Sequence, residues 1–510
     1  MWSRRTLIQS VWAGLVSDAL SGELLRDQID LDQEHQIIEN FGASDAWSMH
    51  KLGTWSLENR NRVADLLFSQ EKGIGLSCWR FNIGGGLHRQ ITNPWRTAET
   101  FEVSEGHYGW TRQAGERWFL AAAKARGVPQ FLAFVNSPPG RMTRNGLTFC
   151  DKGPDTTNLK PGYEGQYARY LVDILEHFRT DPEESQRVEF TYVSPVNEPQ
   201  WDWAGHSQEG NRASNEDIQR IVRSLHAELQ RRHSPTQIAA LESGSLPDLW
   251  QLNAKATSTW KAPYGNYLDA FVGDPALRPL LSERLSYHDY GSDRVAGELV
   301  EHRTKLSEKI RQYPGLKLWM SEYCILTGSE GQGGNDRDLT MNTALDVARI
   351  IHLDLALVGV SAWQWWTAVS GVDFKDGLIY TGWKKAGDPE TIDPARLLWV
   401  LGNYSRFVRP GMRRVEMTVP GQSIDGLLGS AYKDETRRQV VAVYVNRSTR
   451  LQSRQIDFHL GLRRWTLQSL TSYVTSDRPE DQLKPMPSAD RTGAIEIPPR
   501  SVVTAVAQFT

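Results

Sequence analysis

The sequence predicts an α/β fold, a (β/α)8 TIM barrel with an attached small β-sandwich domain. Strand-like apolar segments alternate with helical patterns up to about residue 407, and short alternating segments separated by polar turns follow them. The length of 510 residues exceeds one ordinary domain, but it suits a large barrel that carries a small side domain.

Eight segments of apolar, β-branched composition form the predicted barrel strands. One helix between them carries the i, i+3, i+4, i+7 stripe from Tyr167 to Phe178, and another begins at Ser214, with Asp217 placed to complete a capping box. Eight strands with helices between them fit a closed barrel better than an open sheet. In chain order the predicted strands are 37–43, 73–83, 129–135, 189–196, 237–243, 284–290, 316–322 and 358–366.

The pattern changes after about residue 408. The segments that follow are short, alternate apolar with polar residues and show no helical stripe, which indicates a small antiparallel β-domain. Residues 24–36 have a similar pattern, so we expect them to add a strand to it. We therefore predict a catalytic barrel over residues 37–407 and a β-sandwich side domain from 24–36 together with 408–510.

The N-terminal residues 1–23 resemble a twin-arginine export signal, because Arg4 and Arg5 precede a modestly apolar stretch and then small residues. The alternative is an ordinary N-terminal helix, since Gln9 and Asp18 make a poor apolar segment. We expect an exported protein, periplasmic or extracellular, with a cytoplasmic protein as the alternative. No other run approaches the roughly 20 apolar residues of a membrane span, so we expect none.

Composition narrows the range of partners. The 58 Lys and Arg nearly match the 61 Asp and Glu without a basic stripe, which argues against nucleic acid and anionic membranes. The 19 tryptophans offer the flat apolar faces that sugar sites need, although a large core would explain them too. Cys78, Cys150 and Cys324 lack metal-type spacing and argue against a disulfide framework. The sequence leaves the oligomeric state open.

Reactive groups of such a barrel come from the C-terminal ends of its strands. Glu198 ends the fourth predicted strand and Glu322 ends the seventh, nearly across the barrel mouth. The other candidates are the polar and aromatic residues at strand ends. They are Asp45, Trp47, Arg80, Asn136, Asn197, His288, Tyr290, Trp363 and Trp365.

A pair of carboxylates flanking a cleft is the minimal machinery for hydrolysis of a glycosidic bond. One must be protonated to donate to the leaving oxygen, and the other must be ionised to attack the anomeric carbon. A single glutamate at a strand end would more simply form a surface salt bridge. The pair Glu198 and Glu322, with Asn197 adjacent and two tryptophans on the eighth strand, favours the catalytic interpretation.

Five strand-end motifs in order give the chain a specific resemblance. It resembles glycoside hydrolase family 30, within the clan of retaining (β/α)8 glycosidases, from roughly Gln36 to the C-terminus. The resemblance implies a barrel fused to a side β-sandwich built from both chain ends, and a carbohydrate substrate. The motifs are "ENFGASDAW", "CWRFNIGGG", "SPVNEP", "SYHDYG" and "LWMSEY".

The resemblance also implies roles for the candidate residues. Glu198 corresponds to the acid/base and Glu322 to the nucleophile, while Asn197 would hold the 2-hydroxyl of the sugar. Arg80 would keep Glu322 ionised. The remaining candidates would position these groups or contact the sugar being cleaved: His288 and Tyr290 beside the glutamates, Asp45 on sugar hydroxyls, and Trp365 with Trp363 as an apolar platform.

One departure from the family pattern bears on the substrate. Glucosylceramidase-like members carry a tryptophan after the third strand, where this chain has Asn136 in "AFVNSPPGRMTRNG". "NSPP" and "NEPQWDW" are more similar to the branch with endo-β-1,6-galactanases, so we expect β-1,6-galactan or a similar β-linked polysaccharide. The alternative is an exo-acting β-glycosidase of β-glucosidase, β-xylosidase or β-fucosidase type. Trp201 and Trp203 would stack on leaving-group sugars or simply pack the loop.

Other function classes fit less well. The stretch "NIGGGLHRQ" lacks the G-x-G-x-x-G spacing of a dinucleotide site, and neither an H-E-x-x-H metal motif nor a G-x-S-x-G elbow occurs. We therefore expect no cofactor and no metal. A catalytically inactive carbohydrate-binding protein on a hydrolase scaffold is the remaining alternative, although both glutamates are present.

Overall fold

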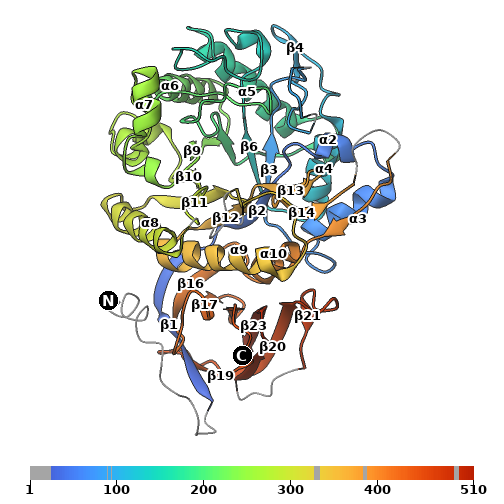
Figure 1. Ribbon diagram of the computed structural model, residues 1–510, viewed down its shortest axis with the longest axis vertical. Helices are drawn as coiled ribbons and strands as arrows, with labels where there is room; N and C mark the ends of the chain where they lie inside the picture. The colour runs from blue at the N-terminus through green and yellow to red at the C-terminus, as the bar shows by residue number, and fades with distance from the viewer. Residues whose placement is uncertain are drawn as a thin grey trace. The chain divides into compact units, whose positions relative to one another are not determined.

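The computed structural model describes residues 24–88, 90–93, 95–293, 295–326, 333–382, 388–487 and 493–510 (Figure 1). The predicted signal segment at 1–23 lies outside these residues. The chain forms two compact units, one of Asn40–Arg337 with Val360–Asp393 and one of residues up to Glu39 with Asp338–Gly359 and Pro394–Thr510. Among the described residues, no helix has the length and apolar character needed to cross a membrane.

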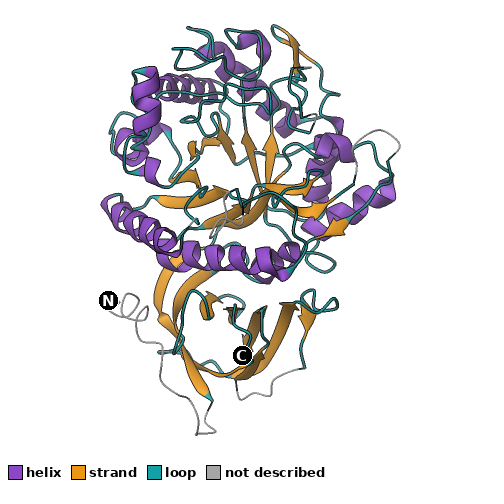
Figure 2. Ribbon diagram, viewed as in Figure 1, coloured by secondary structure: helices purple, strands orange, loops and turns teal. Residues whose placement is uncertain are grey.

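The first unit contains a nine-stranded, all-parallel sheet with helices outside it (Figure 2). The predicted α/β character is confirmed. The strand order is β8-β7-β6-β3-β2-β12-β11-β10-β9. The strands are β2 (Asn40–Ser44), β3 (Cys78–Asn82), β6 (Gln130–Phe134), β7 (Tyr192–Ser194), β8 (Gln237–Ile238), β9 (Leu241–Ser243), β10 (Arg284–His288), β11 (Lys317–Glu322) and β12 (Ala362–Trp365).

The two ends of this strand order lie in one segment, residues 237–243. β8 pairs with β7, β9 pairs with β10, and only Ala239 and Ala240 separate β8 from β9. One predicted strand therefore appears as two short ones, and the sheet curls until both of its ends reach the same segment. Six buried side chains, each from a different segment of the sheet, pack together in one layer: Cys78, Leu132, Tyr192, Ala239, Trp319 and Ala362.

Helices connect the strands as the apolar stripes predict. The stripe residues Tyr167, Leu171 and Phe178 are buried on α5, and Ser214 forms the predicted capping box with Asp217 at the start of α6. The helices are α2 (Met49–Leu52), α3 (Leu57–Phe68), α4 (Ala114–Ala125), α5 (Glu164–Thr180), α6 (Asn215–Arg231), α7 (Ala254–Trp260) and α8 (Ala296–Lys309). Short strands β4 (Glu102–Ser104), β5 (His107–Tyr108), β13 (Thr367–Ser370) and β14 (Gly377–Tyr380) lie in the loops.

The second unit is mostly β and contains another nine-stranded sheet. Its strand order is β21-β20-β23-β18-β17-β16-β1-β19-β22. The strands are β1 (Leu25–Ile37), β16 (Arg413–Thr418), β17 (Leu427–Asp434), β18 (Gln439–Asn446), β19 (Gln452–His459), β20 (Leu467–Ser476), β21 (Lys484–Pro485), β22 (Ala494–Ile497) and β23 (Ser501–Phe509).

Strand β1 joins the two halves of this second sheet. It pairs antiparallel with β16 and parallel with β19, as the strand expected at 24–36 requires. Register shifts after Asp30 and Glu34 bend it, since bulges increase the local twist of a strand. All nine strands therefore lie in one hydrogen-bonded order rather than in two separate sheets, and nearly all of them contribute to one buried apolar cluster.

Two helices group with this β-rich unit, α9 (Met341–Leu353) and α10 (Arg396–Ser405). On α10, the Asn403 side chain donates a hydrogen bond of 3.0 Å to the hydroxyl of Thr504 on β23. On α9, Arg349 pairs with Asp425 at 3.1 Å. The limits of the compact units thus differ from the boundary predicted at 407 and 408.

Candidate active site

The two predicted glutamates lie at the C-terminal ends of parallel strands. Glu322 is the last residue of β11, and Glu198 follows β7. Glu198 has a φ of 45°, a left-handed conformation that is costly for a residue with a Cβ and is concentrated at functional sites. Its backbone N–H donates to the carbonyl oxygen of Glu242 at 2.8 Å, which fixes this turn.

The imidazole of His288 lies between the two glutamates. Its Nδ1 is 3.0 Å from Glu198 Oε1 and 3.4 Å from Glu322 Oε1. All three side chains are buried, and one donor or acceptor atom from each lies within 4.8 Å of the others. The structure therefore brings the predicted pair together, with the predicted His288 between them.

Glu322 accepts hydrogen bonds from two of the other predicted residues. Arg80 Nη1 donates to its Oε2 at 2.9 Å, and the Tyr290 hydroxyl donates to its Oε1 at 3.0 Å. Burial, the largest effect, raises the pKa of Glu322, and the charges of His288 and Arg80 oppose this shift. Burial also raises the pKa of Tyr290 well above its usual value, so this phenol stays a donor.

The sequence analysis missed a third carboxylate, Glu242 on β9. It accepts hydrogen bonds from Ser194 at 2.7 Å and from Ser321 at 2.5 Å, and it lies 2.9 Å from His288 Nε2 and 3.4 Å from Arg80 Nη2. Burial alone would raise the pKa of Glu242, but the charge of Arg80 and the hydrogen bond from His288 lower it to about 2. A glutamate inside the apolar segment "QIAALES" was the available signal.

His288 is consequently held between carboxylates on both ring nitrogens. Burial alone would lower its pKa, but the charge of Glu322 and the hydrogen bonds to Glu198 and Glu242 raise it to about 9. Both nitrogens of the imidazolium then act as donors. The site thus contains two buried cations, Arg80 and His288, among three buried carboxylates.

Asn136 and Asn197 belong to a buried relay of side-chain amides. Asn136 Nδ2 donates to Asn82 Oδ1 at 2.8 Å, and Asn197 Nδ2 donates to Asn136 Oδ1 at 3.1 Å. This direction leaves Asn197 Oδ1 without a hydrogen-bond partner among the described residues. An unpaired acceptor therefore lies beside Glu198, buried from solvent in this structure.

Three residues predicted to contact the sugar are too deeply buried in this structure for direct contact. Asp45 is fully buried, and its Oδ1 accepts from the backbone N–H of Asn82 at 2.8 Å. Trp363 and Trp365 are also fully buried and stack with ring centroids 6.2 Å apart, while the Trp365 indole donates to the carbonyl oxygen of Asp376. In this structure these rings pack beneath the strand ends and present no face to solvent.

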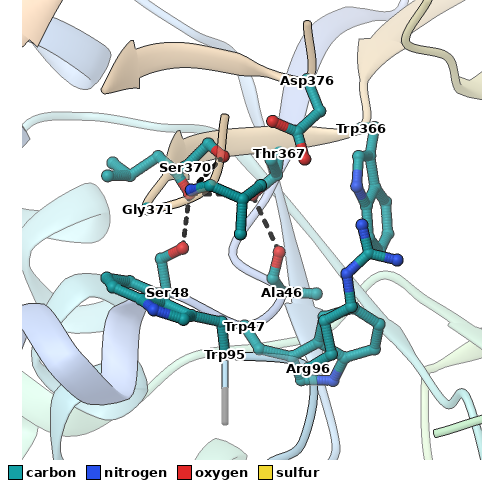
Figure 3. Close-up of a pocket in the computed structure, with 12 residues that line it drawn as sticks. Ala46, Trp47, Ser48, Trp95, Arg96, Trp366, Thr367, Ser370, Gly371 and Asp376 are labelled. Carbon is teal, nitrogen blue, oxygen red and sulfur yellow. Dashed lines mark hydrogen bonds between the residues drawn. The ribbon is translucent and has the colours of Figure 1, made fainter. Parts of the chain in front are cut away.

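A pocket lies next to these strand ends, lined by aromatic and polar side chains (Figure 3). It lies between the segments that follow β2 and β12 and has a volume of about 20 Å³, roughly the space of one water molecule. The predicted Trp47 meets Trp366 edge to face at 5.3 Å, and the Trp366 backbone N–H donates to the carbonyl oxygen of Tyr323, the residue after Glu322. The polar members of its lining include Arg96, Ser370 and Asp376.

The structure separates the two tryptophans that follow Glu198. Trp203 packs against Gly210, where any Cβ would lie 2.3 Å from its ring, and its indole donates to the Glu198 carbonyl oxygen at 2.9 Å. Trp201 is 39% exposed, and its indole edge lies against Gly244, where a Cβ would lie 2.2 Å from the ring nitrogen. Packing therefore explains Trp203, whereas Trp201 presents an open aromatic face.

The spacing of Glu198, His288 and Glu322 is close enough for their atoms to share a metal ion. Each of these atoms is already in a hydrogen bond or ion pair within the cluster, and Arg80 adds a positive charge that would repel a cation. The arrangement fits proton transfer between carboxyl groups better than metal binding. We assign no metal to it.

Comparisons with known proteins point to one family over most of the chain. A family model described as O-glycosyl hydrolase family 30 matches residues 25–380. The chain is 24% identical over 406 residues to an endo-β-1,6-galactanase of Hypocrea rufa, which covers 74% of this chain and 73% of that protein.

Solved structures share the fold. A conserved exported protein of Bacteroides fragilis superposes with a TM-score of 0.83 at 31% identity and covers 95% of this chain and 100% of its own. The catalytic domain of the family 30 xylanase C of Talaromyces cellulolyticus superposes with a TM-score of 0.68 at 18% identity, over 95% of this chain and 100% of that domain. At that identity the second likeness supports the fold alone.

Proposed function

The chain belongs to O-glycosyl hydrolase family 30 and is a glycoside hydrolase, and from this we propose that it cleaves β-linked polysaccharide with retention of configuration. One observation carries the proposal: oxygen atoms of Glu198 and Glu322 lie within 4.8 Å of one another. This suits the carboxyl separation of about 5–5.5 Å in retaining enzymes and not the roughly 6.5–9.5 Å of inverting ones.

We also infer that the curled parallel sheet is the (β/α)8 barrel of this family. The shared segment 237–243 at both ends of the strand order and the buried layer drawn from six segments support closure. In such a barrel the ends of β7 and β11 face one cleft, which is where a glycosidic bond would lie between Glu198 and Glu322.

The proposed reaction has two steps. Glu198 donates its proton to the glycosidic oxygen while Glu322 attacks the anomeric carbon, so the carbon–oxygen bond breaks and a glycosyl-enzyme forms. Glu198, now ionised, then removes a proton from water, and the water oxygen displaces Glu322. The free Oδ1 of Asn197 would accept a hydrogen bond from the sugar 2-hydroxyl, an interaction that strengthens as the oxocarbenium-like state develops.

Arg80 and Tyr290 act on Glu322 in this scheme. Their hydrogen bonds, one to each carboxylate oxygen, favour the ionised form and fix the orientation of the carboxylate. The buried Asp45, Trp363 and Trp365 would support the sugar site from beneath. Trp47 and Trp366 line the small pocket of Figure 3 and are themselves buried, so they too would support the sugar site from beneath.

The substrate we propose is β-1,6-galactan or a similar β-linked polysaccharide, cleaved internally. The similarity to the Hypocrea rufa endo-β-1,6-galactanase supports it. The exposed Trp201 beyond Glu198 supports internal cleavage, because it offers an aromatic face to a sugar on the leaving-group side.

The test is a panel of β-linked substrates. We expect β-1,6-galactan to yield short oligosaccharides early in the reaction, with the first-formed products in the β configuration by proton NMR. β-1,4-xylan, β-1,6-glucan and aryl β-glycosides serve as comparison substrates. Release of single sugars from the chain end only would overturn the internal cleavage, and α-configured first products would overturn retention.

We propose export as well. Arg4 and Arg5 precede a weakly apolar stretch at the N-terminus, and a similar chain of Bacteroides fragilis is described as an exported protein. The mature N-terminus should then lie near residues 20–27. N-terminal sequencing of protein from its own cells checks this, and an intact Met1 would contradict it.

A further inference from the structure

Glu242 has no contact with solvent, and both of its carboxylate oxygens already accept hydrogen bonds from the protein, so it is not placed to bind a substrate. It nevertheless interacts with both cations that contact the two proposed catalytic glutamates, Arg80 and His288. Arg80 approaches it from β3 and His288 from β10, while the hydroxyls of Ser194 on β7 and Ser321 on β11 donate to its two oxygens. Its φ of 53° adds a strained backbone at the same strand end.

The buried charges of this cluster do not cancel when all groups are ionised. Arg80 and His288 carry two positive charges, and Glu198, Glu242 and Glu322 carry three negative ones, with all five side chains buried. Asp45, which also faces Arg80, adds no charge, because burial raises its pKa well above the usual value. An uncompensated buried charge is costly. One proton on a carboxylate removes the imbalance, so the neutral cluster is the one in which one of the three glutamates is an acid.

Hydrogen bonds decide which glutamate holds that proton. Glu242 accepts from four donors, and Glu322 accepts from Arg80 and Tyr290, and these donors favour ionised carboxylates. Among the described residues, the side chain of Glu198 meets only His288 by a hydrogen bond. Glu198 is thus the member of the cluster with the fewest donors to stabilise a negative charge, and the first step of the proposed reaction requires its acid form.

We propose that Glu242 is a positioning residue whose fixed negative charge makes Glu198 the protonated member of the cluster. This inference rests on the proposed function of Glu198. Without the charge of Glu242, two cations would face two carboxylates, and the neutral cluster would hold one proton fewer. The neutral cluster then has two forms. Glu198 is ionised beside a cationic His288 in one, and protonated beside a neutral His288 in the other. The protonated form of Glu198 is therefore less populated than in the natural protein.

The decisive variant is Glu242→Gln, which removes the charge and keeps the size of the side chain. We expect the alkaline limb of the kcat/KM profile for a β-1,6-galactooligosaccharide to move at least one pH unit lower, with a loss of about tenfold or more at pH 7. A nitrophenyl β-galactoside, which needs little proton donation, should lose less. Glu242→Asp, which restores the charge, should return the limb toward its original position.

A matched control is Asp27→Asn, which removes a buried acid of the β-rich unit and should leave the limb in place. An unmoved limb in Glu242→Gln, or equal losses for both substrates, would reduce Glu242 to a structural residue and overturn the proposal. NMR titration of the His288 imidazole tests the role of Glu242 separately from the proposed function. Loss of its proton at lower pH in Glu242→Gln supports the role of the charge even for a protein that cleaves no glycoside, and an unchanged titration contradicts it.

Discussion

Each unit of the protein buries a cluster of charged side chains, and the two clusters differ in charge balance. In the β-rich unit, the buried Asp27 faces one guanidinium, Arg454, at 3.5 Å and accepts a hydrogen bond of 2.9 Å from the Tyr444 hydroxyl. One acid meets one base there. In the parallel-sheet unit, three glutamates meet Arg80 and His288, so acids exceed bases by one.

The difference separates a structural ion pair from a chemical site. A balanced buried pair needs no proton to be neutral, and its residues lie along strands that pair with each other. An excess of one acid makes the cluster hold a proton at a defined place, and parallel strand ends open it toward a ligand. Burial of charge alone is thus a weak sign of function, whereas an odd acid at strand ends is a strong one.

The largest predicted effect comes from removing the proposed nucleophile, Glu322. Glu322→Ala should lower kcat/KM by about 10⁴-fold or more for every substrate, because no glycosyl-enzyme can form. Steady-state kinetics on β-1,6-galactan and on a nitrophenyl β-galactoside measure it. Azide should restore part of the activity on the activated substrate and give a product of inverted configuration.

Glu198→Ala should have a smaller and more selective effect. Proton donation is worth about 10²–10⁴-fold, so polysaccharide cleavage should fall by that factor. Substrates with good leaving groups should still react through the first step, and the glycosyl-enzyme should accumulate and be visible by intact-protein mass spectrometry. The roles of the two glutamates are reversed if Glu198→Ala loses both substrates equally while Glu322→Ala retains the activated one.

The sequence predicts the two glutamates because their positions follow from strand ends alone. Glu198 and Glu322 each end a recognisable apolar segment, and parallel strands bring their ends together. Glu242 could not be predicted in this way, since it stands directly after Leu241 inside an apolar segment and its function depends on partners from four other strands. Its importance is visible only once those strands are assembled.

The fold shows the same limit. Apolar periodicity predicts the parallel strands, the capped helix at Ser214 and the strand near the N-terminus, because these depend on local pattern. It does not predict that α9 and α10 group with the β-rich unit, because a helix stripe shows that one face is buried and not what covers it. Likewise, Trp363 and Trp365 are recognisable as inward residues, but their depth follows from the packing around them.

A substitution beside the charged cluster should weaken binding of the polysaccharide without changing the protonation of the cluster. Trp201→Ala removes an exposed aromatic face and leaves all five charged groups in place. We expect kcat/KM for β-1,6-galactan to fall by about tenfold, from one lost stacking contact of roughly 1 kcal/mol or more. Activity on nitrophenyl β-galactoside and the pH profile should stay unchanged. A shifted pH profile would mean that Trp201 acts on the cluster rather than on the sugar.

The smallest effect on activity is expected from the balanced cluster, where the measurable change is in stability. Burial, opposed by the charge of Arg454 and the hydrogen bond from Tyr444, raises the pKa of Asp27 from 3.8 to about 6. The folded state thus binds a proton more tightly than the unfolded state. The contribution of Asp27 to the free energy of unfolding is fully present below about pH 4 and is lost as the pH rises through about 6.

Asp27→Asn tests this sign directly, because asparagine does not titrate. For the natural protein, this one group should lower the free energy of unfolding by on the order of 3 kcal/mol between pH 4 and pH 7. Urea unfolding at both pH values should show a shallower decrease in the variant, while kcat/KM stays within twofold. An equal decrease in both proteins would mean that Asp27 is ionised at pH 4 as well. An altered kcat/KM would mean that the balanced cluster also serves the reaction, and the contrast between the two clusters would fail.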